Sequence, residues 1–113
     1  MLFRFFNGWK FRDVSVLRVG FFTQFIGLMF SRRKTAIRLF SYETDCRVPI
    51  HSWFVFFDFY VVWLNKENKI IEFRKIRPFT TMIYCTKKFR KIIEIPVNEK
   101  NRNLIHFMSS SLT

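Results

Sequence analysis

His51 is the side chain in this sequence best suited to acid–base chemistry, because an imidazole titrates near neutral pH and can bind a metal. A catalytic role needs a partner, and the nearest acidic residue on the predicted strand is Asp58. On an unbroken strand their spacing puts the two side chains on opposite faces. We therefore favour a structural, hydrogen-bonded His51 beside the core, and keep an enzyme pocket centred on His51 as an alternative.

An apolar or aromatic ligand is a second possibility, because aromatic residues crowd the middle of the chain from Trp53 to Trp63. The side chains expected to line such a site are His51, Trp53, Asp58 and Tyr60. Alternation along a strand puts half of the aromatic rings on each face, so both faces would be apolar. That pattern favours a central strand covered on both sides, with the rings in the core.

Positive charge is the third feature, since 20 Lys and Arg residues outweigh 8 Asp and Glu residues and give a net charge of +12. Such a field attracts nucleic acid, anionic lipid or acidic proteins. The charge gathers in three clusters, which are Arg32-Arg33-Lys34, Arg74-Lys75-Arg77 and Lys87-Lys88-Arg90-Lys91. A solvated face is the favoured interpretation of these clusters, and a nucleic-acid or anion-binding surface is the alternative.

Metal and cofactor chemistry have little support in the sequence. Cys46, Cys85, His51 and His106 show none of the local pairings of metal sites, so we expect no metal and two cysteines that act as small buried apolar groups. Only three glycines are present and no phosphate-binding loop or nucleophile motif occurs, so we expect no cofactor. The longest apolar runs are shorter than the roughly 20 residues of a membrane span, and the two separated cysteines suit a reducing cytoplasm.

The elements that must position these residues are predicted mostly as strands, because Phe occupies 17 positions and aromatic residues suit a pleated surface. A genome biased toward Phe, Ile, Lys and Asn codons would produce the same composition. Strands are expected at 14–19, 35–42, 50–64 with a bend near Asp58, 70–76, 89–95 and 104–107. Residues 21–30 are predicted as a buried helical turn or another strand, 65–69 as a hairpin turn, and 31–34, 43–47, 79–88 and 98–103 as connections.

A succession of short motifs is similar to the domain of unknown function 192 family of bacteria and archaea. The motifs are Gly27-Leu28-Met29-Phe30, Ile50-His51-Ser52-Trp53-Phe54-Val55-Phe56-Phe57, Val61-Val62-Trp63-Leu64, Lys69-Ile70-Ile71, Pro78 and Ile93-Glu94-Ile95-Pro96. The resemblance spans roughly residues 14–107 and implies a compact, mainly β fold, with a short helix at 21–30 and no established enzymatic activity. Tyr60 stands where the family usually has Asp, so the resemblance transfers no site that depends on that Asp.

Residues 1–113 are thus expected to form one mainly β domain, with α+β as the alternative class. We expect a compact antiparallel or mixed sheet or barrel, with one or two short helical turns and frayed ends at 1–10 and 109–113. The favoured function is a small basic noncatalytic module of unspecified ligand and oligomeric state. Nucleic-acid binding and an enzyme at His51 are the alternatives.

Overall fold

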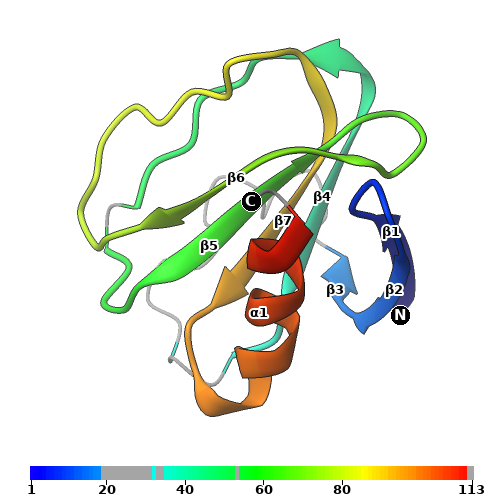
Figure 1. The fold of residues 1–113 in the computed structure, drawn as a ribbon. Coiled ribbons are helices and arrows are strands. Elements are labelled where there is room, and N and C mark those ends of the chain that lie inside the picture. The colour runs from blue at the N-terminus through cyan, green and yellow to red at the C-terminus, as the bar shows by residue number, and fades with distance from the viewer. Residues whose placement is uncertain (19–31, 33–34, 53, 112–113) are drawn as a thin grey trace.

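The fold is built from strands and one C-terminal helix. The computed structural model describes residues 1–18, 32, 35–52 and 54–111. Within them the elements follow in the order β1 (Leu2–Phe6), β2 (Phe11–Ser15), β3 (Leu17–Arg18), β4 (Arg38–Cys46), β5 (Phe59–Leu64), β6 (Ile70–Ile76), β7 (Phe89–Pro96), the 3-10 turn η1 (Glu99–Asn101) and α1 (Arg102–Ser111) (Figure 1). The prediction for residues 21–30 lies outside the described residues.

A five-stranded sheet with the order β3-β4-β7-β5-β6 forms the centre of the molecule, and β1 and β2 form a separate hairpin. The β3–β4 pair is parallel and the other pairs of the sheet are antiparallel. The sheet is therefore mixed, and across the described residues its strands do not close into a barrel. The prediction of a mainly β single domain is confirmed.

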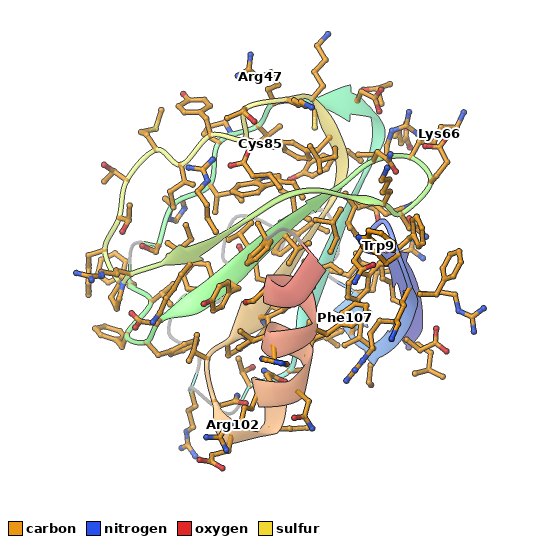
Figure 2. All side chains as sticks on the ribbon, in the orientation of Figure 1. Trp9, Arg47, Lys66, Cys85, Arg102 and Phe107 are labelled. Carbon is orange, nitrogen blue, oxygen red and sulfur yellow. The ribbon has the colours of Figure 1, made fainter. Side chains whose placement is uncertain are left out.

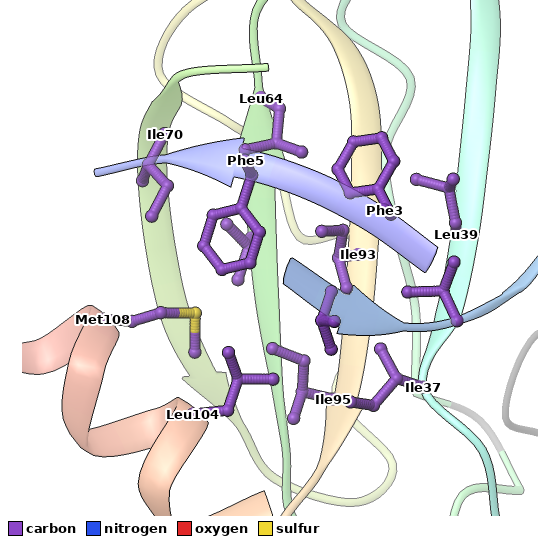
Figure 3. Packing of buried hydrophobic residues seen from close by; sticks show 13 residues of the cluster. Phe3, Phe5, Ile37, Leu39, Leu64, Ile70, Ile93, Ile95, Leu104 and Met108 are labelled. Atoms are coloured by element: carbon purple, nitrogen blue, oxygen red, sulfur yellow. The ribbon is translucent and has the colours of Figure 1, made fainter. Parts of the chain in front are cut away.

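Strands β5 and β7 are buried on both faces, as the apolar sequence of β5 predicts. One face of the sheet packs against β1, β2 and α1 around Phe5, Leu64, Ile93 and Met108 (Figure 3). The other face is covered by the loops at 47–58 and 77–88, and its core includes Trp63. Alternate residues of β5 and β7 thus supply two separate cores.

The prediction of frayed N-terminal residues is wrong, because Leu2–Phe6 pair with Phe11–Ser15 across five register positions. Phe3 and Phe5 alternate with exposed residues and reach the core, which fixes the hairpin onto the sheet. Its turn is held by Asn7, whose Oδ1 accepts hydrogen bonds from the backbone nitrogens of Trp9 and Lys10, each at 2.8 Å. An Asx turn of this kind gives the tip a defined conformation.

The C-terminal segment is a helix, so the predicted strand at 104–107 and the predicted fraying from Ser109 to Ser111 are wrong. Asn98 caps the 3-10 turn η1 that leads into this helix, since the Asn98 Oδ1 accepts from the Asn101 backbone nitrogen at 2.9 Å. Leu104 and Met108, four residues apart, share one helical face and are buried against the sheet. The three apolar positions in 104–107, Leu104, Ile105 and Phe107, were too few to show this helical period.

Two further expectations about strand boundaries need correction. Residues 50–52 and 54–57 are not a strand, and in these described residues there is one isolated bridge, from Ile50 to Ile83. Strand β4 instead continues through the predicted loop at 43–47 as far as Cys46, past a register shift that begins after Ser41. The strands at 70–76 and 89–95 and the hairpin turn at 65–69 are confirmed, the last with Asn68 at a φ of 63°.

Candidate functional site: an aromatic and basic loop surface

Two loops that are distant in sequence, 47–58 and 77–88, run side by side over one face of the sheet (Figure 1). Ile50 and Ile83 exchange backbone hydrogen bonds of 2.8 and 2.7 Å, and both side chains pack into the core below. Val55 and Cys85 are buried in the same cluster. The apolar residues of each loop therefore hold the loops down as a pair.

Ser52 is fully buried and joins the first loop to residues 77–80 of the second. We call this contact between the loops the crossing. The Ser52 hydroxyl donates to the Arg77 carbonyl at 2.6 Å and accepts from the Thr80 backbone nitrogen at 2.5 Å. Its backbone nitrogen donates to the Thr80 carbonyl at 2.8 Å, and its carbonyl accepts from the Phe79 nitrogen at 2.9 Å. Every polar atom of Ser52 thus makes a bond between the loops, which gives the crossing a defined backbone.

Three phenylalanine rings emerge around this crossing, and they are between 43% and 60% exposed. Phe79 meets the rings of Phe54 and Phe56 edge to face, with centroids 6.1 and 5.4 Å apart. Phe54 and Phe79 both have a φ of 58°, in the left-handed region that is unfavourable for bulky residues. The loop backbone thus accepts strain at the two residues that place aromatic rings in solvent.

Further exposed side chains from the second loop extend this surface. Met82 and Tyr84 are 61% and 46% exposed, and Met82 also has a positive φ of 51°. Arg77 is exposed at the crossing, where its carbonyl accepts from Ser52 and from the Thr80 hydroxyl. Lys87 and Lys88 are exposed at the far end of the same loop. We call this set the loop surface: Phe54, Phe56, Arg77, Phe79, Met82, Tyr84, Lys87 and Lys88.

The structure divides the predicted basic residues into two groups. Arg74 lies 4.9 Å above the Trp63 ring, pairs with Glu72 at 2.6 Å and donates to the Tyr84 carbonyl. The other internal pairs are Lys75 with Asp58 at 3.7 Å, Arg90 with Asp45 at 3.1 Å, and Lys91 with Asn68. Arg32, Arg77, Lys87 and Lys88 are exposed, and Arg33 and Lys34 lie outside the described residues. Of the predicted clusters, the described residues that belong to the loop surface are Arg77, Lys87 and Lys88.

The residues proposed around His51 are not gathered into one site. His51 is exposed in the first loop, whereas Tyr60 lies on the opposite face of the sheet and packs against Phe73 at 6.0 Å. The Asp58 carboxylate is paired with Lys75, and Trp53 lies outside the described residues. The alternation expected for a single strand through 50–64 fails here, because the chain becomes a strand only at Phe59.

Glu94, a carboxylate that could serve as a partner of His51, is instead buried in the core. It is 6% exposed in the middle of β7, and its Oε1 has no hydrogen-bond partner among the described residues. Burial raises the pKa of Glu94 to about 7, and the charge of Arg38, its cross-strand neighbour on β4, opposes that rise. The signal that could have revealed it is one acidic residue inside the apolar run Ile92–Pro96.

A second carboxylate, Glu72, organises the end of the second loop. It accepts hydrogen bonds from the Thr86 hydroxyl at 2.6 Å and from the Thr86 nitrogen at 3.1 Å. These bonds and Arg74 lower the pKa of Glu72 even though burial alone would raise it. Glu72 therefore works as a negatively charged anchor for the loop.

The described residues offer little to a metal. No three His, Cys, Asp or Glu side chains there come together in a group that could hold an ion. Cys46 and Cys85 are free thiols, and burial is the main cause that raises the pKa of Cys85. Within the described ranges, the helices are too short or too polar to cross a membrane.

Comparison with known proteins identifies the fold. No protein-family model and no curated protein matches the sequence. The chain is similar to a crystal structure from Sinorhizobium meliloti 1021 described as a "putative transcription regulator", with a TM-score of 0.73, 17% identity, and coverage of 89% of this chain and 82% of that one. It is also similar to a protein of unknown function from Novosphingobium aromaticivorans DSM 12444, with a TM-score of 0.67, 12% identity, and coverage of 89% and 75%. At these identities the similarity shows a shared fold, and the resemblance to the domain of unknown function 192 family stays a prediction.

Proposed function

We propose that this protein is a small noncatalytic module that binds single-stranded nucleic acid across the loop surface. The observation that carries the proposal is the cluster of Phe54, Phe56 and Phe79, three exposed rings at a crossing that also presents Arg77. Proteins that bind single strands combine such stacking platforms with basic residues that follow the phosphates. Both elements occur here on one pair of loops.

A single strand fits this surface better than a duplex, because bases stack on exposed rings only when they are unpaired. Duplex readers commonly place a helix in the major groove. Helix α1 instead packs Leu104 and Met108 into the core. The net charge of +12 supports association with a polyanion.

The structural neighbour from Sinorhizobium meliloti supports nucleic acid as the ligand class, since that protein is described as a "putative transcription regulator". We also propose that the protein is related to the domain of unknown function 192 family and that it is located in the cytoplasm. An enzyme centred on His51 has less support. Of the two carboxylates that could act with His51, Asp58 pairs with Lys75 and Glu94 is buried, whereas His51 is exposed.

Fluorescence anisotropy with labelled single- and double-stranded oligonucleotides, at about 50 and 200 mM salt, tests the proposal. We expect single strands to bind more tightly than duplexes and to bind more weakly at the higher salt. Phe56→Ala should lower affinity for single strands about 5- to 100-fold, as expected when one stacking ring is removed. Phe11→Ala, an exposed ring on the N-terminal hairpin, is the matched control and should bind as the wild type does. No binding at either salt, or equal loss in both variants, would refute the proposal.

A further inference from the structure

The N-terminal hairpin carries a second exposed apolar surface, far from the loop surface in sequence. Trp9 and Phe11 are 82% and 66% exposed, and the Phe6 ring packs against Phe11 with centroids 4.8 Å apart. Phe6 and Phe11 are register partners on the face opposite the buried Phe5. We call Phe6, Trp9 and Phe11, at the turn end of the hairpin, the hairpin patch.

The hairpin patch is a built feature and does not depend on a loose end of the chain. Asn7 accepts from two backbone nitrogens in the turn, and Gly8 takes a φ of 101° that other residues rarely adopt. The hairpin is also tied to the neighbouring turn, because the Phe6 nitrogen donates to the Asn68 carbonyl at 2.8 Å. Trp9 is therefore held outward at the tip of a defined turn.

Basic side chains surround this apolar tip. Lys10 follows Trp9, and Lys69 faces Phe6 across an isolated bridge. Lys66 stands on the adjoining turn, above Trp9 in the view of Figure 2. All three lysines are exposed; of the acidic residues nearby, Asp13 is paired with Arg4 at 2.7 Å and Glu67 is exposed. The surface is thus an apolar projection within a mainly positive rim.

We propose that the hairpin patch docks on anionic lipid membranes, with Trp9 and Phe11 inserted at the interface and the lysines against the headgroups. Tryptophan favours the membrane interface, where one end of the ring is apolar and the other is wet. Basic residues beside anionic lipid strengthen binding about fivefold each, and the cytoplasmic leaflet carries that negative charge. This proposal concerns a different surface from the loop surface and does not rest on nucleic-acid binding.

The observations favour lipid over two other occupants. A second copy of this chain would bring the same positive rim against itself, so its charge opposes pairing. A nucleic-acid strand would match the charge, but Phe6 and Phe11 pack against each other and so offer bases less stacking surface. A bilayer interface accepts Phe and Trp together and supplies the negative charge.

Sedimentation with sucrose-loaded vesicles tests this proposal, using phosphatidylcholine alone or with about a third phosphatidylserine. We expect binding to the anionic vesicles only, reversal by high salt, and at least roughly a tenfold loss of affinity in Trp9→Ala. Lys10→Glu, which keeps the apolar tip, should also weaken binding. Phe56→Ala on the loop surface is the matched control and should bind vesicles as the wild type does. Circular dichroism verifies that each variant is folded.

Tryptophan fluorescence supplies an independent readout. Trp9→Phe keeps an aromatic ring, so the difference between its emission and that of the wild type gives the emission of Trp9. On anionic vesicles this emission should shift to shorter wavelength and be quenched by brominated lipid. Three results would overturn the proposal: no binding to anionic vesicles, Trp9→Ala vesicle binding equal to wild type, or Trp9 emission unchanged by vesicles. Loss of oligonucleotide affinity in Trp9→Ala without loss of vesicle binding would instead assign the patch to nucleic acid, and concentration-dependent dimers abolished by Trp9→Ala would assign it to self-association.

Discussion

The Ser52 hydroxyl oxygen lies 2.5 Å from the Thr80 backbone nitrogen, so a buried serine in one loop accepts a hydrogen bond from the other loop. Ser52 is two residues before Phe54 and Thr80 directly follows Phe79, and both phenylalanines have a left-handed φ. The hydrogen bond therefore links the internal structure of the loops to the exposed rings of the candidate site.

Replacing Ser52 by Ala should destabilise the loop crossing. The substitution leaves the Thr80 nitrogen and the Arg77 carbonyl without their Ser52 partner, at a cost of about 1–3 kcal/mol in the free energy of unfolding. Urea denaturation measures that cost, and oligonucleotide titration should show weaker binding as the rings lose their fixed positions. Ser41→Ala, an exposed serine of β4, is the control and should change neither quantity. Wild-type stability in Ser52→Ala would show that the crossing does not depend on this hydroxyl.

Glu94 should make stability depend on pH. Its folded pKa of about 7 lies above the ordinary glutamate pKa of 4.5 that applies to the unfolded chain, so the folded state holds the proton more tightly. The contribution of Glu94 to the free energy of unfolding is therefore fully present below about pH 4.5. It is lost as the pH rises through about 7. The loss is roughly 3 kcal/mol when the whole difference in pKa is realised.

Glu94→Gln removes that titration, so its free energy of unfolding should vary less than the wild type's between about pH 5 and 8. Denaturant titrations at several pH values measure the difference. Glu43→Gln, at an exposed position of β4, should keep the slope of the wild type. A wild-type slope in Glu94→Gln would contradict a protonated Glu94 in the folded state.

Arg74 should contribute to stability more than to nucleic-acid binding. Its guanidinium covers Trp63 and pairs with Glu72, so Arg74→Met should lower the free energy of unfolding by about 1–3 kcal/mol.

The double variant Lys87→Met, Lys88→Met should leave stability nearly unchanged. It should instead make the plot of log affinity for oligonucleotide against log salt concentration less steep. The slope should fall by about one for each phosphate that a lysine no longer neutralises. Anisotropy at several salt concentrations separates the two outcomes, and a reversed pattern would place Arg74 in the binding surface.

Asn98 should stabilise the C-terminal helix through its cap. Asn98→Ala removes the acceptor for the Asn101 nitrogen and should cost about 1 kcal/mol, whereas Asn98→Asp keeps an acceptor and should cost less. Hydrogen exchange of the α1 amides measures the effect locally. Asn103→Ala, an exposed position inside α1, is the control and should be neutral or stabilising. Equal exchange in Asn98→Ala and the wild type would show that the cap bond contributes nothing.

Local signals explain which elements the sequence predicted correctly. Strands β6 and β7 each end at or just before a proline, at Pro78 and Pro96, and Asn68 takes the left-handed conformation that a tight turn needs. Within β6, however, a register shift near Ile70 moves Ile70 and Ile71 to faces opposite to those that simple alternation predicts. A bulge of this kind depends on the partner strand, so the sequence of β6 alone does not reveal it.

The segment from His51 to Phe57 shows the opposite case. Val55 and Phe57 are buried while Phe54 and Phe56 are exposed, which is the alternation of a strand, but among the described residues the backbone of 54–57 pairs with no strand. Burial alternates because the loop lies flat on the core, with Ser52 holding it to Thr80. Periodicity reports which side chains are buried, and it does not report the backbone hydrogen bonds that define a strand.

By itself the sequence determined that this chain forms a mainly β domain with a strongly positive net charge, because aromatic and β-branched composition, turn residues and charge are local or additive properties. Only the tertiary structure decided which rings and charges are available to a ligand. Phe54, Phe79 and Trp9 are exposed while Phe57 and Trp63 are buried, and Arg74 is paired while Arg77 is exposed. The physical reason is that exposure and pairing depend on contacts between segments distant in sequence, such as those between the two loops and between the hairpin and the sheet.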